Sequence, residues 1–145
     1  MIKKKELRKK EIEDKLKDII DSIMIVDENL PKETDDFLNS GLIKDGIYKK
    51  IEFSIQNVID ICNILNSDLR LGTPETEDSI LENLEKNKIL GKRIIGLIRE
   101  MKGFRNILSH KYGTVNDEQA YEDIKDGLKD FELIIKEFEE LLKKN

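Results

Sequence analysis

The residues best suited to chemistry lie in one short stretch, GFRNILSHKYG at residues 103 to 113, which holds the only histidine of the 145-residue chain. A guanidinium, here that of Arg105, presents a planar set of N–H donors that fits a phosphate group. An imidazole exchanges protons near neutral pH, and His110 supplies one. Together the two side chains could bind a phosphodiester and transfer a proton to or from it.

Helical spacing places Arg105 at the edge of an apolar face. It follows Ile98 by seven residues and Ile94 by eleven, and a helix turns by about 100° per residue, so the guanidinium lies between them. An arginine there pairs with an acid, extends along its stem to water, or binds an anionic ligand. His110 lies near the expected helix end, where it fits either proton transfer or a favourable charge beside the helix dipole. The apolar sector itself comprises Leu90, Ile94, Leu97, Met101, Phe104 and Leu108.

Other polar residues of the segment allow several roles. Asn106 could orient His110, bind phosphate or cap the helix. Ser109 is expected to act only locally, because no acid or base near it in the sequence would activate it as a nucleophile. Three further cations are candidate phosphate contacts or solvent-exposed side chains, namely Lys102, Arg99 and Lys111.

The charge of the chain is unevenly distributed. The whole chain carries a formal charge of −5, whereas residues 86–112 contain eight Lys or Arg and one acid, a net +7, which leaves −12 on the rest. A cationic strip on an acidic body suits a polyanionic substrate, and the acidic remainder limits non-specific binding. A solvated helix face with scattered lysines is the alternative interpretation.

Composition favours a single helical domain over residues 1–145. Hydrophobic residues make up 38% and charged residues 39%, with two prolines and no tryptophan, so the core should consist of Ile and Leu. Cys62 sits at an apolar position and is expected to be a buried thiol in a reducing, cytoplasmic setting. The single His and the distant single Cys match no metal-ligand spacing, so no metal site is expected. We also expect no Gly-rich phosphate-binding loop, no targeting segment and no membrane span.

Apolar periodicity predicts helices that position the motif. The first spans about residues 5–28, and after Pro31 a second stretch leads into a long core helix from Ile47 to Leu65, with Gly41 and Gly46 as sites of a kink or break. Gly72 should end that helix, and Thr73-Pro74 should begin a short one.

The motif helix is expected over about 88–109, followed by a last helix over about 117–143. Apolar residues of this last helix are spaced alternately by three and four, which indicates a heptad-like seam. No alternating strand pattern occurs. The fold class predicted is therefore all-α, an up-and-down bundle of four to five antiparallel helices. The seam comprises Tyr121, Ile124, Leu128, Phe131, Ile135, Phe138 and Leu142.

The run from Arg105 to Tyr112, RNILSHKY, resembles the Arg-x4-His-x-Tyr signature of the HEPN superfamily, and specifically its HepT-like branch of small toxins from bacteria and archaea. The preceding Gly103-Phe104 and the long closing helix are similar to that branch too. The resemblance extends over essentially the whole chain, because the expected order of helices also agrees.

This resemblance implies a metal-independent endoribonuclease whose active site forms at a two-fold dimer interface. Cleavage of RNA through its 2'-hydroxyl needs a base, an acid for the departing 5'-oxygen and cationic donors for the developing charge. Each chain has one histidine, and a two-fold dimer supplies a second His110 and a second Arg105. We therefore expect these two residues to be catalytic, in a homodimer that acts on RNA.

Tyr112 has a separate role by the same resemblance. In HepT-like systems a nucleotidyltransferase antitoxin silences the toxin by transferring AMP to the tyrosine of this motif. The added phosphate would bring negative charge and bulk next to Arg105 and His110 and repel the substrate. Tyr112 is thus the expected modification site, with an unmodified tyrosine packed over the loop before Gly113 as the alternative.

A second hypothesis for the function is a non-catalytic helical module that docks a nucleotidyltransferase or binds nucleotides. In that case Arg105 and His110 would hold a phosphate without turnover. Cleavage of RNA by the purified protein distinguishes the two hypotheses.

Overall fold

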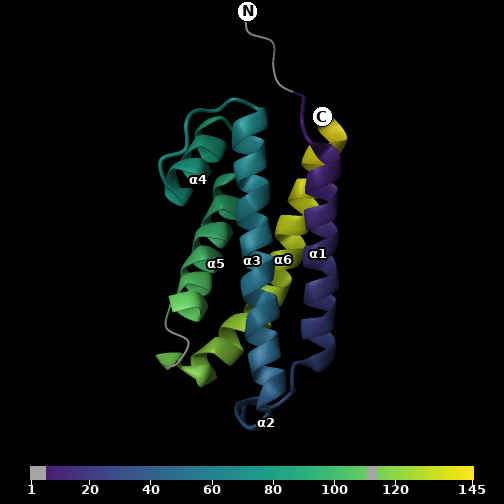
Figure 1. Cartoon of the computed structure of the whole chain (residues 1–145), viewed down its shortest axis with the longest axis vertical. Helices are drawn as coiled ribbons and strands as arrows, with labels where there is room; N and C mark the ends of the chain where they lie inside the picture. The colour runs from purple at the N-terminus through teal and green to yellow at the C-terminus, as the bar shows by residue number, and fades with distance from the viewer. Residues whose placement is uncertain (1–5, 111–113) are drawn as a thin grey trace, which may run out of the picture.

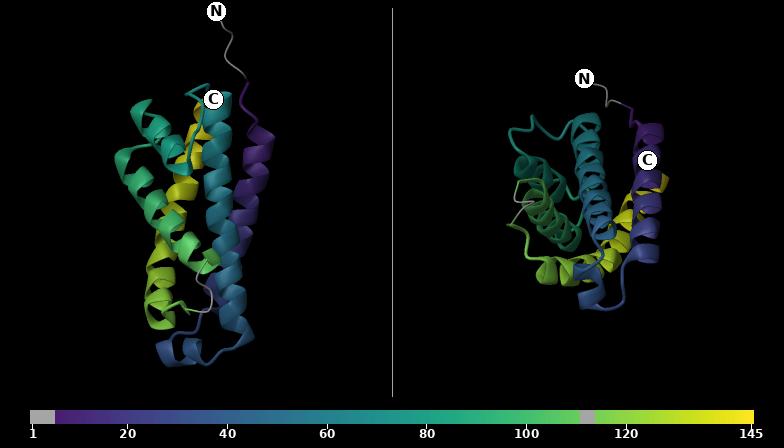
Figure 2. Two further views of the ribbon diagram at one scale, coloured as in Figure 1. Left: turned by 60° about the vertical axis from the view of Figure 1, so that its left-hand side comes forward. Right: turned by 60° about the horizontal axis from the view of Figure 1, so that its bottom comes forward.

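The computed structural model describes residues 6–110 and 114–145, which form six α-helices and no strand. Four long helices alternate in direction, and the start of the first lies at the same end of the bundle as the end of the last (Figures 1 and 2). The predicted all-α, up-and-down bundle is confirmed. A short additional helix brings the number of helices in the described residues to six, above the predicted four to five. The helices are α1 (Lys9–Asn29), α2 (Thr34–Leu38), α3 (Leu42–Asp68), α4 (Glu77–Lys86), α5 (Lys92–His110) and α6 (Asp117–Lys144).

The central helix α3 packs against α1 on one side and α5 on the other, and α6 closes the bundle by contacting α1 and α5. The core is dominated by Ile and Leu, as predicted. Cys62 on α3 has no exposed surface, and burial raises the pKa of its thiol to about 12. The α6 seam is confirmed, since five of its seven members are buried and Leu128 and Leu142 pack at its edge. No helix in the described part of the chain is both long and apolar enough to cross a bilayer.

The first helix begins later than expected, at Lys9, because Arg8 is engaged elsewhere. Its backbone N–H and its guanidinium both donate to the carboxylate of Asp68, which is fully buried at the end of α3. Gly41 does break the second stretch, as predicted, since it precedes α3 with a φ of +58°. Gly46 lies within α3 and interrupts nothing.

The connection between α3 and α4 was predicted wrongly at both ends. The helix ends at Asp68, four residues before Gly72, because Arg70 adopts a left-handed conformation and the N–H of Leu71 donates to the carbonyl of Asn66. The next helix is capped by Thr76 and not by Thr73-Pro74. Thr76 and Ser79 form a reciprocal capping box, which satisfies two N–H groups that the Thr73-Pro74 start would leave open.

The motif helix α5 begins at Lys92, later than the predicted start near 88. Lys88 has a φ of +57°, and the N–H of Ile89 donates to the carbonyl of Leu84, so this segment is the end of α4. Helix α5 then continues to His110 and includes the first part of the motif. As a result α4 lies beside α3 and α5 at one end of the bundle (Figure 2).

Candidate functional site

The predicted apolar sector is confirmed in part, since Leu90, Met101 and Leu108 are buried, but the inward face of α5 is rotated from the one predicted. Ile98, placed at the margin by the sequence pattern, has no exposed surface, whereas Ile94 and Leu97 are only half-buried. The sequence pattern gives only the average direction of the apolar side chains. The residues that lie innermost are decided by the packing of α5 against three helices, α3, α4 and α6. Because Arg105 follows Ile98 by about two turns, it also points inward, and only 11% of its side chain is exposed.

Arg105 is held by five hydrogen bonds, one for each N–H of its guanidinium. Glu77 accepts two of them with its two carboxylate oxygens, at 3.0 Å from Nη1 and 2.7 Å from Nη2. Gln56 Oε1 accepts from Nη1 at 2.9 Å. Asn106 Oδ1 accepts from both Nη2, at 2.6 Å, and Nε, at 3.2 Å. The guanidinium therefore joins three helices, α3, α4 and α5.

Glu77 and Gln56 are the residues that sequence reasoning missed. An acid as one partner of Arg105 was among the alternatives, but 28 residues separate Glu77 from it and 49 separate Gln56. No local pattern links residues that far apart. The Thr76–Ser79 capping box is the one sequence signal nearby, since it makes Glu77 the first residue of α4.

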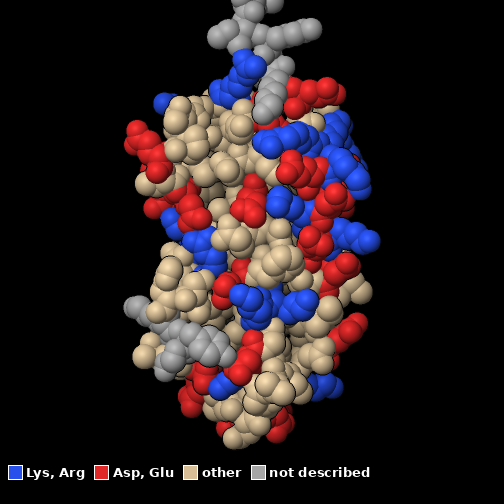
Figure 3. Space-filling model, viewed as in Figure 1, with Lys and Arg blue, Asp and Glu red and all other residues tan. Residues whose placement is uncertain are grey.

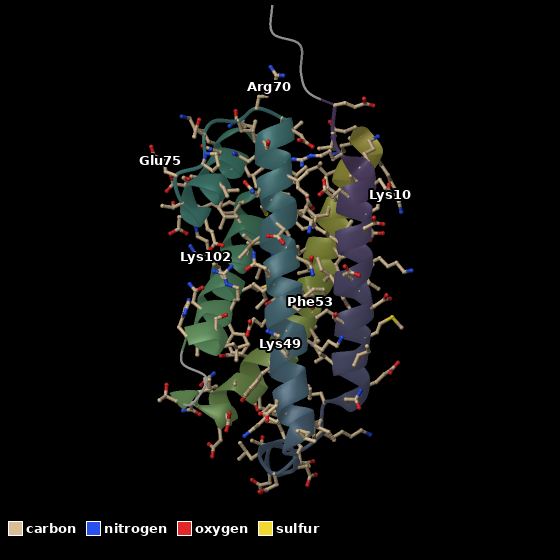
Figure 4. The ribbon with its side chains drawn as sticks, viewed as in Figure 1. Lys10, Lys49, Phe53, Arg70, Glu75 and Lys102 are labelled. Carbon is tan, nitrogen blue, oxygen red and sulfur yellow. The ribbon has the colours of Figure 1, made fainter. Side chains whose placement is uncertain are left out.

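A groove of about 450 Å³ surrounds these residues. Helix α3 forms one wall, and Figure 4 shows its Lys49 and Phe53 on the face turned to the viewer. His110 is exposed at the last position of α5 and lines the same groove as Arg105. The structure thus brings the two residues predicted to be catalytic to one surface. The lining comprises Lys49, Glu52, Phe53, Gln56, Glu77, Arg105, Asn106, Ser109 and His110.

Two of the other predicted cations, Lys102 and Arg99, do not line this groove. Lys102 pairs with Asp78 at 2.6 Å, and Arg99 lies 3.7 Å from Glu85. Both acids belong to α4, so with Glu77 this helix pairs with three of the eight cations of the strip. Figure 3 shows red and blue side chains together on the left, where α4 and α5 lie. Lys111 and Tyr112, the remaining predicted site residues, lie outside the described residues.

The ion pair between Arg105 and Glu77 shifts the pKa of both partners. The hydrogen bond from Arg105 lowers the pKa of Glu77 against the opposing effect of burial. In turn, the hydrogen bond to Glu77 raises the pKa of Arg105. The pair is therefore fully ionised at neutral pH, and its net charge is zero. A phosphate that enters the groove meets no large excess of positive charge from Arg105 and Glu77 together.

A second cavity, of about 360 Å³, lies between α3, α5 and α6 and has a mainly apolar floor. Four acids surround it, and burial raises the pKa of one of them, Asp130. Such a rim repels phosphate, so the groove at Arg105 is the better candidate for a polyanion. Within residues 6–110 and 114–145, no three His, Cys, Asp or Glu side chains are arranged to hold a metal ion. The four acids are Glu100, Asp123, Asp126 and Asp130.

The bundle and its Arg-x4-His groove define a small helical protein of the HEPN type. The chain belongs to the ribonuclease HepT-like family, whose family model matches residues 12–138. A related protein, the mRNA nuclease HepT of Shewanella oneidensis, is 26% identical over 99 residues, which make up 68% of this chain and 74% of that protein.

Solved structures share the fold. The tri-AMPylated HEPN toxin of Shewanella oneidensis, in complex with its MNT antitoxin, superposes with a TM-score of 0.80 at 22% identity, over 89% of this chain and 96% of that one. YutE, a cytosolic protein of unknown function from Bacillus subtilis, gives a TM-score of 0.80 at 15% identity, over 95% of this chain and 92% of that one. At these identities the likeness concerns the fold.

Proposed function

We propose that this protein is a metal-independent RNA endonuclease, the toxin of a toxin–antitoxin pair. The observation that carries the proposal is the groove in which Arg105, Asn106 and His110 meet, within a bundle of the ribonuclease HepT-like family. The whole chain acts as one HEPN-like domain, in the cytoplasm, with RNA as its substrate.

The reaction is transesterification through the 2'-hydroxyl of the RNA. One histidine takes the 2'-hydroxyl proton as the 2'-oxygen attacks the phosphorus, and a second gives a proton to the departing 5'-oxygen. Arg105 stabilises the negative charge that develops on the phosphate. It gains a donor for this when phosphate displaces Gln56 from Nη1, because a neutral amide is a weaker partner than the charged carboxylate of Glu77.

The second histidine comes from a second copy of the chain, which makes the protein a homodimer with a composite site. Apolar side chains beside the groove support this arrangement. Phe53 lines the groove and is 44% exposed, and Ile107, the residue after Asn106, is 42% exposed. Covering them with a second copy removes apolar surface from water and brings the two His110 side chains together.

Tyr112 is the proposed site of regulation. A nucleotidyltransferase antitoxin transfers AMP to it and so adds negative charge two residues after His110 in the chain. The test is intact-mass spectrometry after co-expression with such an enzyme. Added AMP units that disappear in Tyr112→Phe are expected, whereas modification that persists in this variant would place the site elsewhere.

The ribonuclease activity is tested with the purified protein, single-stranded RNA or tRNA, and excess EDTA. The wild type should cut the RNA, and His110→Ala should not, while its helix content by circular dichroism stays the same because His110 is exposed. Ser109→Ala is a matched control, since Ser109 lines the same groove and has no proposed role in proton transfer. Full activity of His110→Ala would refute the mechanism.

The alternative function is a non-catalytic module that docks a nucleotidyltransferase or binds nucleotides. One observation favours it: every N–H donor of Arg105 already has an acceptor within the chain. On this alternative the protein cuts no RNA, yet it binds a nucleotide or is isolated together with the nucleotidyltransferase.

A further inference from the structure

The orientation of the Asn106 side chain is fixed by Arg105. A guanidinium has only donors, so the oxygen of the Asn106 amide must face it, and Oδ1 accepts from both Nε and Nη2. The amide nitrogen, Nδ2, therefore points away from Arg105. Nδ2 has no hydrogen-bond acceptor among the described residues, and Asn106 is half-buried in the wall of the groove. The groove thus gains an oriented N–H donor pair.

Arg105 can orient Asn106 only if it is itself held in place, and Glu77 holds it most firmly. The two carboxylate oxygens of Glu77 meet Nη1 and Nη2 in a bidentate pair, which fixes the plane of the guanidinium as well as its position. Gln56, the third partner, is an exposed residue whose neutral amide accepts one hydrogen bond from the guanidinium. Glu77 in turn is fixed as the first residue of α4 by the Thr76–Ser79 capping box.

We propose that Glu77 is a positioning residue of the ribonuclease site, which aims Arg105 and, through it, the Asn106 amide at the phosphate of the RNA. This role rests on the proposed function. The carboxylate touches neither RNA nor His110; it acts by holding two donors where phosphate binds, and preorganised donors of this kind need no rearrangement during the reaction. Helix α4 therefore belongs to the active site, although the motif lies wholly on α5 and the segment after it.

The test compares Glu77→Gln with Asp78→Asn. Gln keeps the size of Glu77 but has one acceptor oxygen and no charge, so the bidentate pair is lost. We expect kcat to fall by about 10- to 100-fold, the loss that follows from misplacing a catalytic group, with KM nearly unchanged. Asp78 is the matched control, because it is adjacent, pairs with the α5 residue Lys102 and lies outside the groove. Its substitution should change kcat by less than about threefold, as expected for an exposed pair.

A double-mutant cycle tests the route through Arg105. Because Glu77 acts only by holding that side chain, Glu77→Gln should cause no further loss of kcat in an Arg105→Ala background. Equal losses in both backgrounds would refute the proposal. So would an increase in activity or RNA affinity of Glu77→Gln, which would mean that the carboxylate competes with phosphate for Arg105.

An NMR measurement separates failure of this proposal from failure of the proposed function. In the wild type the Nε–H of Arg105 and the Nδ2 protons of Asn106 should give distinct side-chain signals that shift on addition of an RNA with a 2'-deoxy cleavage site. In Glu77→Gln the Arg105 signal should broaden and the Asn106 shift should shrink. If the wild type cuts no RNA, the proposed function fails, and unchanged side-chain signals in Glu77→Gln would refute positioning independently. Helix content and melting temperature of each variant confirm that it is folded.

Discussion

Replacing Arg105 by lysine tests whether this side chain connects α4 to the rest of the bundle. Lysine keeps the positive charge but concentrates its three donors on one nitrogen, which cannot meet both oxygens of Glu77 and also Asn106. At least two of the five hydrogen bonds of Arg105 are then lost.

The expected cost follows from the geometry of those bonds. Hydrogen bonds to charged groups contribute about 1.5 to 3 kcal/mol each, and neutral ones about 1 kcal/mol. Glu77 is 37% exposed, so solvent screening reduces its share to the low end. We expect the free energy of unfolding to fall by about 2 kcal/mol at pH 7, which lowers the urea midpoint by about 1 M.

The measurement is urea unfolding followed by circular dichroism, with Arg99→Lys as the control. Arg99 lies on the same helix, but its side chain is 42% exposed and 3.7 Å from Glu85, so its substitution should cost less than about 0.5 kcal/mol. Equal effects of the two substitutions, or a loss below about 0.5 kcal/mol for Arg105→Lys, would show that the guanidinium does not stabilise the bundle.

The difference between wild type and Arg105→Lys should also depend on pH. The pKa of Glu77 is lowered in the folded protein by its hydrogen bond from Arg105. Its contribution to stability is therefore complete above the ordinary glutamate pKa, near 4.5, and is lost as the pH falls through the lowered value. The two unfolding free energies should converge below pH 4, and a difference that stays constant down to pH 2.5 would contradict the assignment.

Three further predictions concern other parts of the bundle. In urea unfolding, Ile98→Ala should destabilise the protein by about 2 to 4 kcal/mol, and Ile94→Ala by only about 1 kcal/mol because Ile94 is half-buried. A larger loss for Ile94→Ala would show that the inward face of α5 is the one predicted from the sequence. The Cys62 thiol, buried and with its pKa raised to about 12, should react with a thiol reagent at pH 8 only when urea unfolds the chain. Asp117→Asn should lower the free energy of unfolding by about 1 to 2 kcal/mol at pH 7. Burial raises the pKa of Asp117, but the hydrogen bonds from Tyr48 and Lys44 outweigh it and lower the pKa, so the difference from wild type should disappear in acid.

Much of the fold could be predicted because helices are local and periodic. The spacing of apolar residues identified α1, α3, α5 and α6, and the α6 seam proved correct because every third or fourth residue returns to the same face. The helix ends were harder. Arg70 and Lys88 occupy left-handed positions after α3 and α4 where glycine is usual, so the sequence offered no glycine signal at either place.

The sequence by itself determined that Arg105 and Asn106 lie on one helix with His110 near its end. It left three roles open for Arg105, namely pairing with an acid, extending to water and binding an anionic ligand. The tertiary structure decided that Arg105 pairs with Glu77 of α4 and that Lys102 and Arg99 pair with other α4 acids instead of lining the groove. The reason is physical: the order of side chains around one helix depends on its own residues. Which side chains of two helices meet depends on where each helix begins and how the whole core packs between them.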